Sequence, residues 1–564
     1  MRTITQSLRD PTIPNKVVEN LWRSLVRLPA GTGFFLAESG LILTNHHVVW
    51  KLLRETAGLP HDRFETGFSA KSWNDAIPVP NLSAETLVFV EKAAGATDLS
   101  ICDNLTYTRW FDVRLIYIPG IHLAKVGSAP RQHYLFDFAI LSIFDGNKPV
   151  TPPSDRSLRI SLRDVREGET LVTAGFTEYT KRNIHPLDLQ QEICWRVPLR
   201  QTKIYRRLSF LEQQKRFGRK YDRLRGELSV LQAHKFVPLP DGCPDFLDEP
   251  IADILAQERR LLPGELYANH GYSYLLKYLL TAVALRRAGG ELVWRQLTAA
   301  TSREKALEWL ATSQVRNLDQ EVADLHYSLE ETIRELGHSH GFVQALVRGR
   351  TIDEVKRLIL TSNLALPAAR LELASGSVLD ELEIMGIGAV DQMIGILGEL
   401  NRLRERICRE NERYVRSIPS SILMPDADFS PRVSVGRVSG WTRGDRRFPA
   451  ILPLKHLIHA GIHQLAGANP RLTHLENIPT FIFHEADVGG GASGSPVVDD
   501  AGQVVGLIIG GNPESLAGRW RKTEGARAVT LSIRSVIEML KATDGDSLVS
   551  RLLPYSFCDC RAQA

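Results

Sequence analysis

A glycine-rich loop near the end of the chain restricts the fold most. Residues 489–496 read Gly-Gly-Gly-Ala-Ser-Gly-Ser-Pro. Glycine on both sides of Ser493 lets the backbone adopt positive φ and approach a substrate closely. When a serine attacks a carbonyl, backbone N–H groups in such a turn can stabilise the oxyanion. Two apolar runs around an Asp/Gly turn come next at 497–509, so the loop predicts a nucleophilic serine that leads into a β-hairpin.

A candidate general base lies near the other end of the chain. Residues 31–49 contain two apolar strands that are joined by a Glu-Ser-Gly turn and followed by His46 and His47. A serine nucleophile needs a general base, most often histidine. The pattern Leu-Thr-Asn-x-His-Val favours His47 as the base, and His46 as a neighbour that packs or hydrogen-bonds.

Asp137 is the candidate partner of this base. It stands in the apolar stretch Tyr-Leu-Phe-Asp-Phe-Ala-Ile-Leu, where a carboxylate is costly to bury unless it is hydrogen-bonded. An imidazole N–H is a natural donor to it. The chain order His47, Asp137, Ser493 is that of the two-barrel serine peptidases. We therefore expect acyl transfer through a catalytic triad, with no metal and no cofactor.

Composition limits the class of protein. A hydrophobic content of 43% and a charged content of 24% are typical of a globular protein, and a net charge of +4 gives no reason to expect nucleic acid. No apolar run has the length of a membrane helix, the N-terminus lacks the apolar core of a signal peptide, and the six cysteines show no disulfide framework. We expect a cytoplasmic protein with a peptide or protein substrate, no nucleic-acid partner and no membrane, and we leave a homodimer open.

The pattern along the chain predicts two β-rich parts with a helical part between them. We expect a first β-barrel over 14–203, an inserted α-helical domain over 204–424, a second β-barrel over 425–545 and a tail over 546–564. The fold class is thus mainly β plus α, a chymotrypsin-like double β-barrel with a large helical insertion. The last strands of the first barrel are expected at 137–144, 169–176 and 192–199. The clearest helices are expected at 208–235, 272–287, 318–336, 390–418 and 533–541.

Several segments resemble those of the S46 peptidases, the bacterial dipeptidyl-peptidases of types 7 and 11. The segments are Gly-Leu-Ile-Leu-Thr-Asn-His-His at 40–47, Asp-Phe-Ala at 137–139 with Asn-Lys-Pro at 147–149, the stretch 425–438, the Ser493 loop, and Gly-Asn-Pro-Glu at 511–514. The resemblance covers roughly half of the chain. It implies that the helical domain covers the cleft and helps to select free N-termini.

The resemblance also implies roles for single residues. His47 would be the base, Asp137 its orienting partner and Ser493 the nucleophile, with the N–H groups of Gly491 and Ser493 as the oxyanion hole. Gly511 falls where the family sets the preference for the second substrate residue. A glycine there predicts an apolar preference. The substrate-binding candidates are Gly511, Gly510, Asn512 and Arg131.

The chain also departs from the family pattern. Val48 replaces a cysteine, no secretory signal is visible, and Gly510 replaces an aspartate that helps to bind the substrate amine. The family's Asn-Trp pair for the same amine is missing from 127–131, where only Pro-Arg remains. Two alternatives therefore stay open. One is an endopeptidase with an open cleft, in which Asp487 would favour basic side chains. The other is a binding protein that keeps the peptidase fold without turnover.

Overall fold

The computed structural model describes most of the chain. The described residues are 2–3, 13–29, 31–36, 39–55, 66–80, 82–92, 101–126, 133–152, 156–217, 221, 224, 225, 228, 231, 250–268, 273–315, 317–376, 381–418, 426–443, 445–454, 477–543 and 546–553. The chain divides into two compact units. The first, which we call the sheet unit, consists of Met1–Asn183, Phe210–Pro238 and Ser421–Ala564, and the second, the helical unit, consists of Ile184–Ser209 and Leu239–Ser420.

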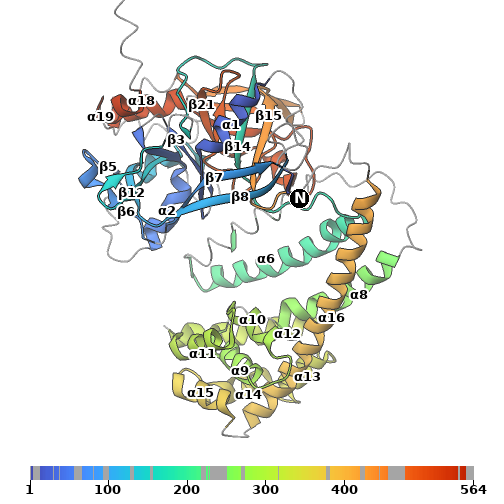
Figure 1. Cartoon of the computed structure of the whole chain (residues 1–564). Helices are drawn as coiled ribbons and strands as arrows, with labels where there is room; N and C mark the ends of the chain where they lie inside the picture. Colours follow the sequence, from blue (N-terminus) through green and yellow to red (C-terminus); the bar gives the residue numbers. More distant parts are fainter. Residues whose placement is uncertain are drawn as a thin grey trace, which may run out of the picture. The chain divides into compact units, whose positions relative to one another are not determined.

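The first sheet of the sheet unit is antiparallel and holds the segments around His47 and Asp137 (Figure 1). Its main strand order is β1-β8-β7-β2-β3-β4-β12-β9-β5, with β13 paired to β12 and β6 to β9. The strands are β1 (Arg2–Thr3), β2 (Leu25–Leu28), β3 (Gly31–Leu36), β4 (Leu41–Thr44), β5 (Gly67–Ser69), β6 (Ile77–Pro78), β7 (Ala84–Lys92), β8 (Ile101–Trp110), β9 (Val113–Pro119), β12 (Ala139–Asp145) and β13 (Lys148–Pro149).

The second sheet carries the hairpin that comes after Ser493. Its strand order is β15-β14-β20-β21-β22-β19-β18. The strands are β14 (Thr170–Phe176), β15 (Pro431–Arg437), β18 (Ile451–Pro453), β19 (Pro479–His484), β20 (Pro496–Val498), β21 (Val504–Gly511) and β22 (Ala528–Ser532). From the sequence, the strand at 169–176 is expected in the first barrel. In the structure β14 pairs with β15 and β20 in the second sheet. The described strand order of neither sheet closes on itself.

Apolar side chains between these elements form the core of the sheet unit. One cluster of buried residues joins both sheets with the short helices that pack on them, from Leu21 and Trp22 to Leu540 and Leu552. Two further small strand pairs are β10 (Lys125–Val126) with β11 (His133–Tyr134) and β16 (Trp441–Arg443) with β17 (Arg446–Phe448). The unit's helices are α1 (Asn15–Ser24), α2 (His46–Glu55), η2 (Trp73–Asp75), α4 (Ile121–Ala124), η8 (Pro513–Arg519), α18 (Ile533–Thr543) and α19 (Asp546–Leu552).

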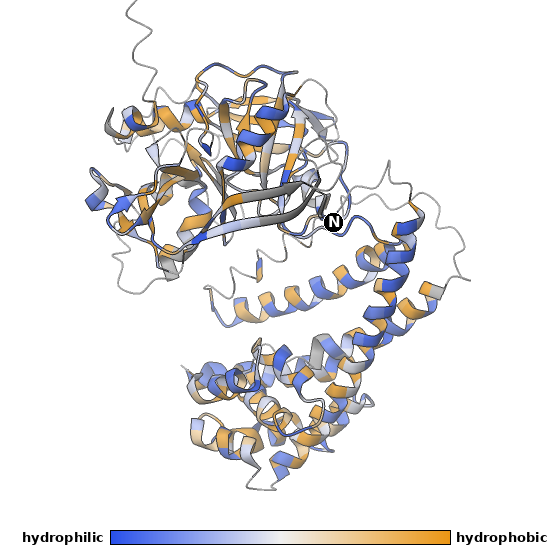
Figure 2. Ribbon diagram, in the orientation of Figure 1, coloured by the Kyte–Doolittle hydropathy of each residue, from blue (hydrophilic) through white to orange (hydrophobic). Residues whose placement is uncertain are grey.

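The helical unit has its own hydrophobic core, centred on α9, and its helices carry both hydrophobic and hydrophilic residues (Figure 2). The helix α12 has the bounds expected from the sequence, and the helices expected at 272–287 and 390–418 correspond to α9 and to the C-terminal part of α16. The helices are α5 (Pro186–Gln191), η4 (Glu192–Arg196), α6 (Val197–Gln213, in part), α8 (Pro250–Ala268), α9 (Tyr274–Ala284), α10 (Glu291–Thr298), α11 (Arg303–Thr312), α12 (Leu318–Leu336), α13 (Gly341–Val347), α14 (Ile352–Thr361), α15 (Pro367–Ser375) and α16 (Glu381–Ser417).

The strand expected at 192–199 is wrong. Residues Glu192–Arg196 form a short π-helix, which continues directly into α6. A buried ion-pair cluster stabilises the helical segment, because the Arg196 guanidinium contacts the carboxylates of Asp188, Glu192 and Glu258. Asp188 and Glu192 lie eight and four residues before Arg196, a spacing that puts all three on one helix face. Among the described residues, no helix is both long and apolar enough to cross a membrane.

Candidate active site

His47 and Asp137 meet at one end of an antiparallel strand pair. Ala139 at the start of β12 pairs with Thr44 at the end of β4, so the residues just before β12 and just after β4 are neighbours. His47 lies in the first turn of α2, and its Nδ1 is 2.6 Å from Asp137 Oδ2. The backbone N–H of His47 donates to Asp137 Oδ1 at 2.9 Å. Both carboxylate oxygens therefore bind the same residue.

This contact sets the orientation and the tautomer of the imidazole. Asp137 is fully buried, whereas the His47 side chain is 28% exposed. A carboxylate is an acceptor, so in the neutral imidazole the proton lies on Nδ1, and Nε2 has the free lone pair that a general base needs. The Asn45 side-chain amide donates to the Asp137 backbone carbonyl at 2.7 Å and so restrains the backbone of the aspartate.

Thr32 in β3 fixes the loop that carries Ser493. Its backbone N–H donates to the Ser493 carbonyl at 2.8 Å, and its hydroxyl donates to the Gly491 carbonyl at 3.0 Å. The same hydroxyl accepts from the Phe176 N–H at 3.0 Å. The Thr44 hydroxyl donates to the Thr32 carbonyl at 2.7 Å. One connected network thus links the serine loop to the strand that ends beside His47.

A close approach of backbones accounts for the glycine at position 31. A Cβ there would lie 2.7 Å from Val48 Cγ2 and 2.9 Å from the Ser493 carbonyl oxygen. Real Cβ atoms do not make such short contacts, so only glycine fits without a shift of its neighbours. The residue after His47 and the backbone of Ser493 therefore flank the same glycine.

The serine loop has the geometry of an anion-binding turn. Gly491 and Gly494 have φ of +80° and +85°, which glycine adopts readily. The N–H groups of Ala492, Gly494 and Ser495 donate to backbone carbonyls. Those of Gly491 and Ser493 have no acceptor among the described residues. The N–H of Ser493 itself and that of Gly491 are thus the two in this loop that could donate to a developing negative charge.

The other substrate-binding candidates have different surroundings. A Cβ at Gly510 would meet nothing within 4 Å, whereas one at Gly511 would lie 2.0 Å from Ser515 Oγ. The Asn512 side chain is buried and makes hydrogen bonds through both its oxygen and its nitrogen. Its Oδ1 accepts from the N–H groups of Ser515 and Arg527, and its Nδ2 donates to the Gly525 carbonyl. Asn512 therefore holds the loop after β21 in place. Arg131 lies outside the described residues.

Asp487 has a partner within the chain. The Arg182 guanidinium binds both of its carboxylate oxygens, Nη1 to Oδ2 and Nη2 to Oδ1, the latter at 2.9 Å. The Arg182 Nε donates to the Gly518 carbonyl at 2.6 Å. A bidentate arginine compensates the negative charge of Asp487. The hypothesis that Asp487 selects basic substrate side chains is therefore not favoured.

Sequence reasoning missed several residues that build this site. Thr32 and Asn45 stand inside the motifs that contain the glycines and His47. The available signal is a polar side chain within or directly after an otherwise apolar, buried strand. Arg182 and Phe429, whose ring abuts Gly491, had no signal of this kind, because their partners lie far away in the sequence.

A family comparison agrees with this arrangement. The family model described as Peptidase S46 matches residues 9–97, 103–227 and 295–553, which is most of the chain. The chain belongs to peptidase family S46. The match includes His47, Asp137 and Ser493, and it confirms the resemblance inferred from the sequence.

Curated dipeptidyl-peptidase 7 sequences are similar over a limited region. A dipeptidyl-peptidase 7 of Phocaeicola vulgatus is 37% identical over 29% of this chain and 31% of the relative. A dipeptidyl-peptidase 7 of Porphyromonas gingivalis is 21% identical over 29% of this chain and 30% of the relative. The matched region thus spans about a third of the length of these relatives.

Solved S46 structures match the fold over nearly the whole chain. Dipeptidyl-peptidase 11 (DPP11) of Porphyromonas endodontalis superimposes with a TM-score of 0.66 at 15% identity, covering 97% of this chain and 95% of that one. The same enzyme in complex with the dipeptide Arg-Glu gives 0.65 at 16% identity, with 94% of each chain covered. The mixed structure of antiparallel sheets and many helices is therefore the fold of DPP11.

Proposed function

We propose that the protein is a serine peptidase that releases dipeptides from the free N-termini of peptides. The observation that carries the proposal is the pairing of the buried Asp137 carboxylate with His47, in a structure where Thr32 ties the Ser493 loop to the strand before His47. Membership of family S46 and the names of the curated relatives support dipeptide release.

The proposed mechanism is acyl transfer. His47 Nε2 removes the proton from Ser493 Oγ as that oxygen attacks the peptide carbonyl, and Asp137 stabilises the imidazolium that forms. The N–H groups of Gly491 and Ser493 donate to the oxyanion. His47 then protonates the leaving amine, and water hydrolyses the acyl-enzyme with His47 as base.

The proposed preference at the second substrate residue is apolar. Gly510 and Gly511 end β21 without a charged side chain, and Asp487 is compensated by Arg182. The serine loop before β20 contacts β21, since the Gly494 N–H donates to the Ile508 carbonyl at 2.8 Å, and this contact supports a role for the end of β21 in substrate binding. An uncharged pocket wall favours transfer of an apolar side chain out of water.

The finer architecture belongs to the same proposal. We propose that the two sheets correspond to the two β-barrels of the trypsin-like fold, since β4 and β12 position the base and the loop before β20 carries the nucleophile. A cytoplasmic location, a homodimer and the lack of a nucleic-acid partner stay predictions, which cell fractionation, light scattering and a gel-shift assay would check.

A peptide digest tests the proposal. Peptides of one sequence, with free or acetylated N-termini, are incubated with the protein and with the Ser493→Ala variant, and the products are identified by mass spectrometry. We expect dipeptides from free N-termini only, no products with Ser493→Ala, and a rate about 10⁴-fold lower with Asp137→Asn. Internal cleavage of both peptides would instead indicate an endopeptidase. A lack of cleavage in both would indicate a binding protein.

A further inference from the structure

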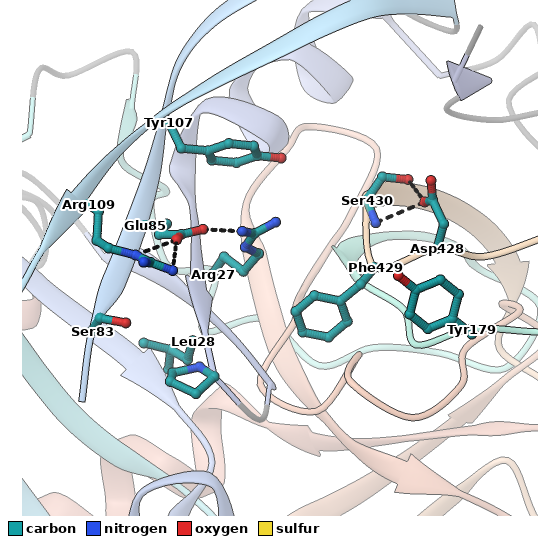
Figure 3. Close-up of a pocket in the computed structure, with 11 residues that line it drawn as sticks. Arg27, Leu28, Ser83, Glu85, Tyr107, Arg109, Tyr179, Asp428, Phe429 and Ser430 are labelled. Carbon is teal, nitrogen blue, oxygen red and sulfur yellow. Dashed lines mark hydrogen bonds and ion pairs between the residues drawn. The ribbon is translucent and has the colours of Figure 1, made fainter. Parts of the chain in front are cut away.

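The sheet unit contains a pocket of about 500 Å³ beside the Ser493 loop (Figure 3). It is lined by residues from five segments of the chain, all in the sheet unit. Phe429 and Tyr179 lie on one side of the pocket, and Tyr107 and Leu28 lie on the opposite side (Figure 3). The opposite side also holds an ion-pair group in which Glu85 binds both Arg27 and Arg109.

Two contacts and one short sequence separation place this pocket next to the nucleophile loop. A Cβ at Gly491 would lie 2.8 Å from Phe429 Cε2. The N–H of Glu178, the residue before Tyr179, donates to the Gly490 carbonyl at 2.6 Å. Thr32, which binds the Ser493 carbonyl, lies four residues after Leu28. The pocket therefore lies against the flank of the loop that Gly490 and Gly491 form.

The other flank of the loop lies against β21. Gly494 donates to the Ile508 carbonyl there, and β21 continues to Gly510 and Gly511, where the proposed function places the acyl part of the substrate. In the tetrahedral intermediate the acyl chain and the leaving amine depart from one carbon in different directions. If the acyl part lies along the end of β21, the opposite flank faces the leaving segment.

The pocket's charges are balanced. Arg27 and Arg109 are positive, and Glu85 and Asp428 are negative. Both guanidinium groups contact Glu85, and Asp428 accepts hydrogen bonds from the N–H and the hydroxyl of Ser430. The Arg27 guanidinium also lies 5.9 Å from the centre of the Phe429 ring. A site without net charge and with aromatic walls suits an uncharged aromatic or large aliphatic group.

The backbone of Phe429 adds an independent observation. Its φ is +63°, which is unfavourable for a bulky residue. Its N–H donates to the Thr177 carbonyl at 2.9 Å. The Asp428 carboxylate accepts a hydrogen bond from the N–H of Ser430, the residue after Phe429. Such conformations persist where the surrounding structure enforces them, often beside functional sites. Here the conformation places the Phe429 ring against Gly491.

We propose that this pocket binds an aromatic or large aliphatic side chain of the first or second residue of the leaving segment. The inference rests on the proposed function, because it takes Ser493 as the nucleophile. It adds a preference for the residues on the C-terminal side of the cleaved bond, with Phe429 and Tyr179 as specificity-determining residues.

The test measures how the acyl-enzyme divides between water and added amines. A dipeptide methyl ester, free or N-acetylated, forms the acyl-enzyme whichever N-terminus the protein accepts. An added amine then attacks the acyl carbonyl, and the C–N bond forms as the ester bond to Ser493 breaks. His47 takes a proton from the attacking amine and gives it to Ser493 Oγ. Glycinamide, phenylalaninamide and glycyl-phenylalaninamide are compared at equal concentration, and mass spectrometry gives the ratio of aminolysis to hydrolysis.

We expect phenylalaninamide or glycyl-phenylalaninamide to give a ratio of aminolysis to hydrolysis about tenfold higher than glycinamide gives. Tyr179→Ala and Phe429→Gly should lower the preference to about threefold or less. Tyr179 is 69% exposed and glycine adopts the φ of Phe429 readily, so both variants should fold. Phe111→Ala is the matched control, because Phe111 is 76% exposed and does not line the pocket, and it should keep the preference.

The outcomes separate the two proposals. Equal ratios for all three amines in the wild-type protein would overturn the pocket's role while leaving the serine mechanism in place. So would a preference that survives in both pocket variants. Absence of ester hydrolysis that depends on Ser493 would overturn the proposed function, and the inference would fall with it.

Discussion

At the scale of single residues, the conformation of the serine loop depends on glycines that no other residue can replace. Gly494 has φ of +85°, and a Cβ there would lie 2.0 Å from the Thr32 carbonyl oxygen. Because Thr32 also binds the Ser493 carbonyl, any shift at position 494 moves the nucleophile as well.

Gly494→Ala should therefore lose both stability and activity. The left-handed backbone costs about 1–2 kcal/mol for alanine, and the overlap with Thr32 adds about 1–3 kcal/mol. A nucleophile displaced by about 1 Å loses about 10²-fold in rate. Gly502→Ala is the control, since Gly502 has φ of +76° but its Cβ would be no closer than 3.4 Å to Val17. Urea denaturation and peptide turnover measure both effects, and equal losses in the two variants would contradict the prediction.

His484 gives the protein a pH-dependent stability. It is fully buried in β19 with Nε2 2.8 Å from Thr530 Oγ1, and this burial lowers its pKa to about 3. The unfolded chain takes up a proton at His484 below its ordinary pKa of about 6.5, whereas the folded chain does not. The free energy of unfolding therefore falls as the pH decreases from about 6.5 towards 3, and this stability is fully present above that window.

A His484→Gln variant removes this titration while it keeps a hydrogen-bonding group near Thr530. Between pH 6.5 and pH 5 the wild-type protein should lose up to about 1.4 kcal/mol per pH unit more than the variant. Urea denaturation at pH 7, 6 and 5, monitored by tryptophan fluorescence, gives both pH profiles. Parallel profiles for the two proteins would show that His484 does not titrate on unfolding.

At the scale of elements, long-range pairing overrode local pattern in two places. The local pattern of residues 169–176 predicts a strand, and the structure has one there. Only the pairing of β14 with β15 and β20 assigns this strand to the second sheet. Residues 192–199 combine β-branched and aromatic side chains, which favour a strand. In the structure they are helical, and the helical spacing brings Asp188 and Glu192 to the buried Arg196.

This buried cluster predicts a large difference between two nearby arginines. Arg196→Met leaves three buried carboxylates without their common partner, which should cost about 3–5 kcal/mol. Arg200→Met removes only a contact at 3.5 Å from a side chain that is 40% exposed, and should cost about 0–1 kcal/mol. Circular dichroism during urea denaturation measures both, and similar losses would mean that the cluster is not a determinant of this helix.

At the scale of the whole molecule, the two units have separate hydrophobic cores. The largest core of the sheet unit draws on both sheets and on α1, α18 and α19, whereas the core of the helical unit is built around α9. A chain with two such cores does not have to unfold in one cooperative step.

We expect calorimetry to show two transitions that respond to different changes. Leu279 in α9 is fully buried, so Leu279→Ala should reduce the free energy of unfolding of the helical unit by about 2–5 kcal/mol. Only the transition of that unit should therefore move to a lower temperature. A sulfonyl fluoride bound to Ser493 should shift only the other transition. A single transition that moves with both changes would show that the units unfold together.

The sequence alone determined the local chemistry of the site. The glycine-rich serine loop, the strand pair before His47, the isolated Asp137 and the order of the three residues are all visible in short stretches, because turn residues and apolar alternation act locally. Family S46 was inferred from the same stretches. Only the tertiary structure decided which distant groups complete the site. Thr32 holds a loop 459 residues away, Arg182 compensates Asp487, and Phe429 forms a pocket beside Gly491. Such contacts leave no local signal, because they depend on the way that the sheets bring remote segments together.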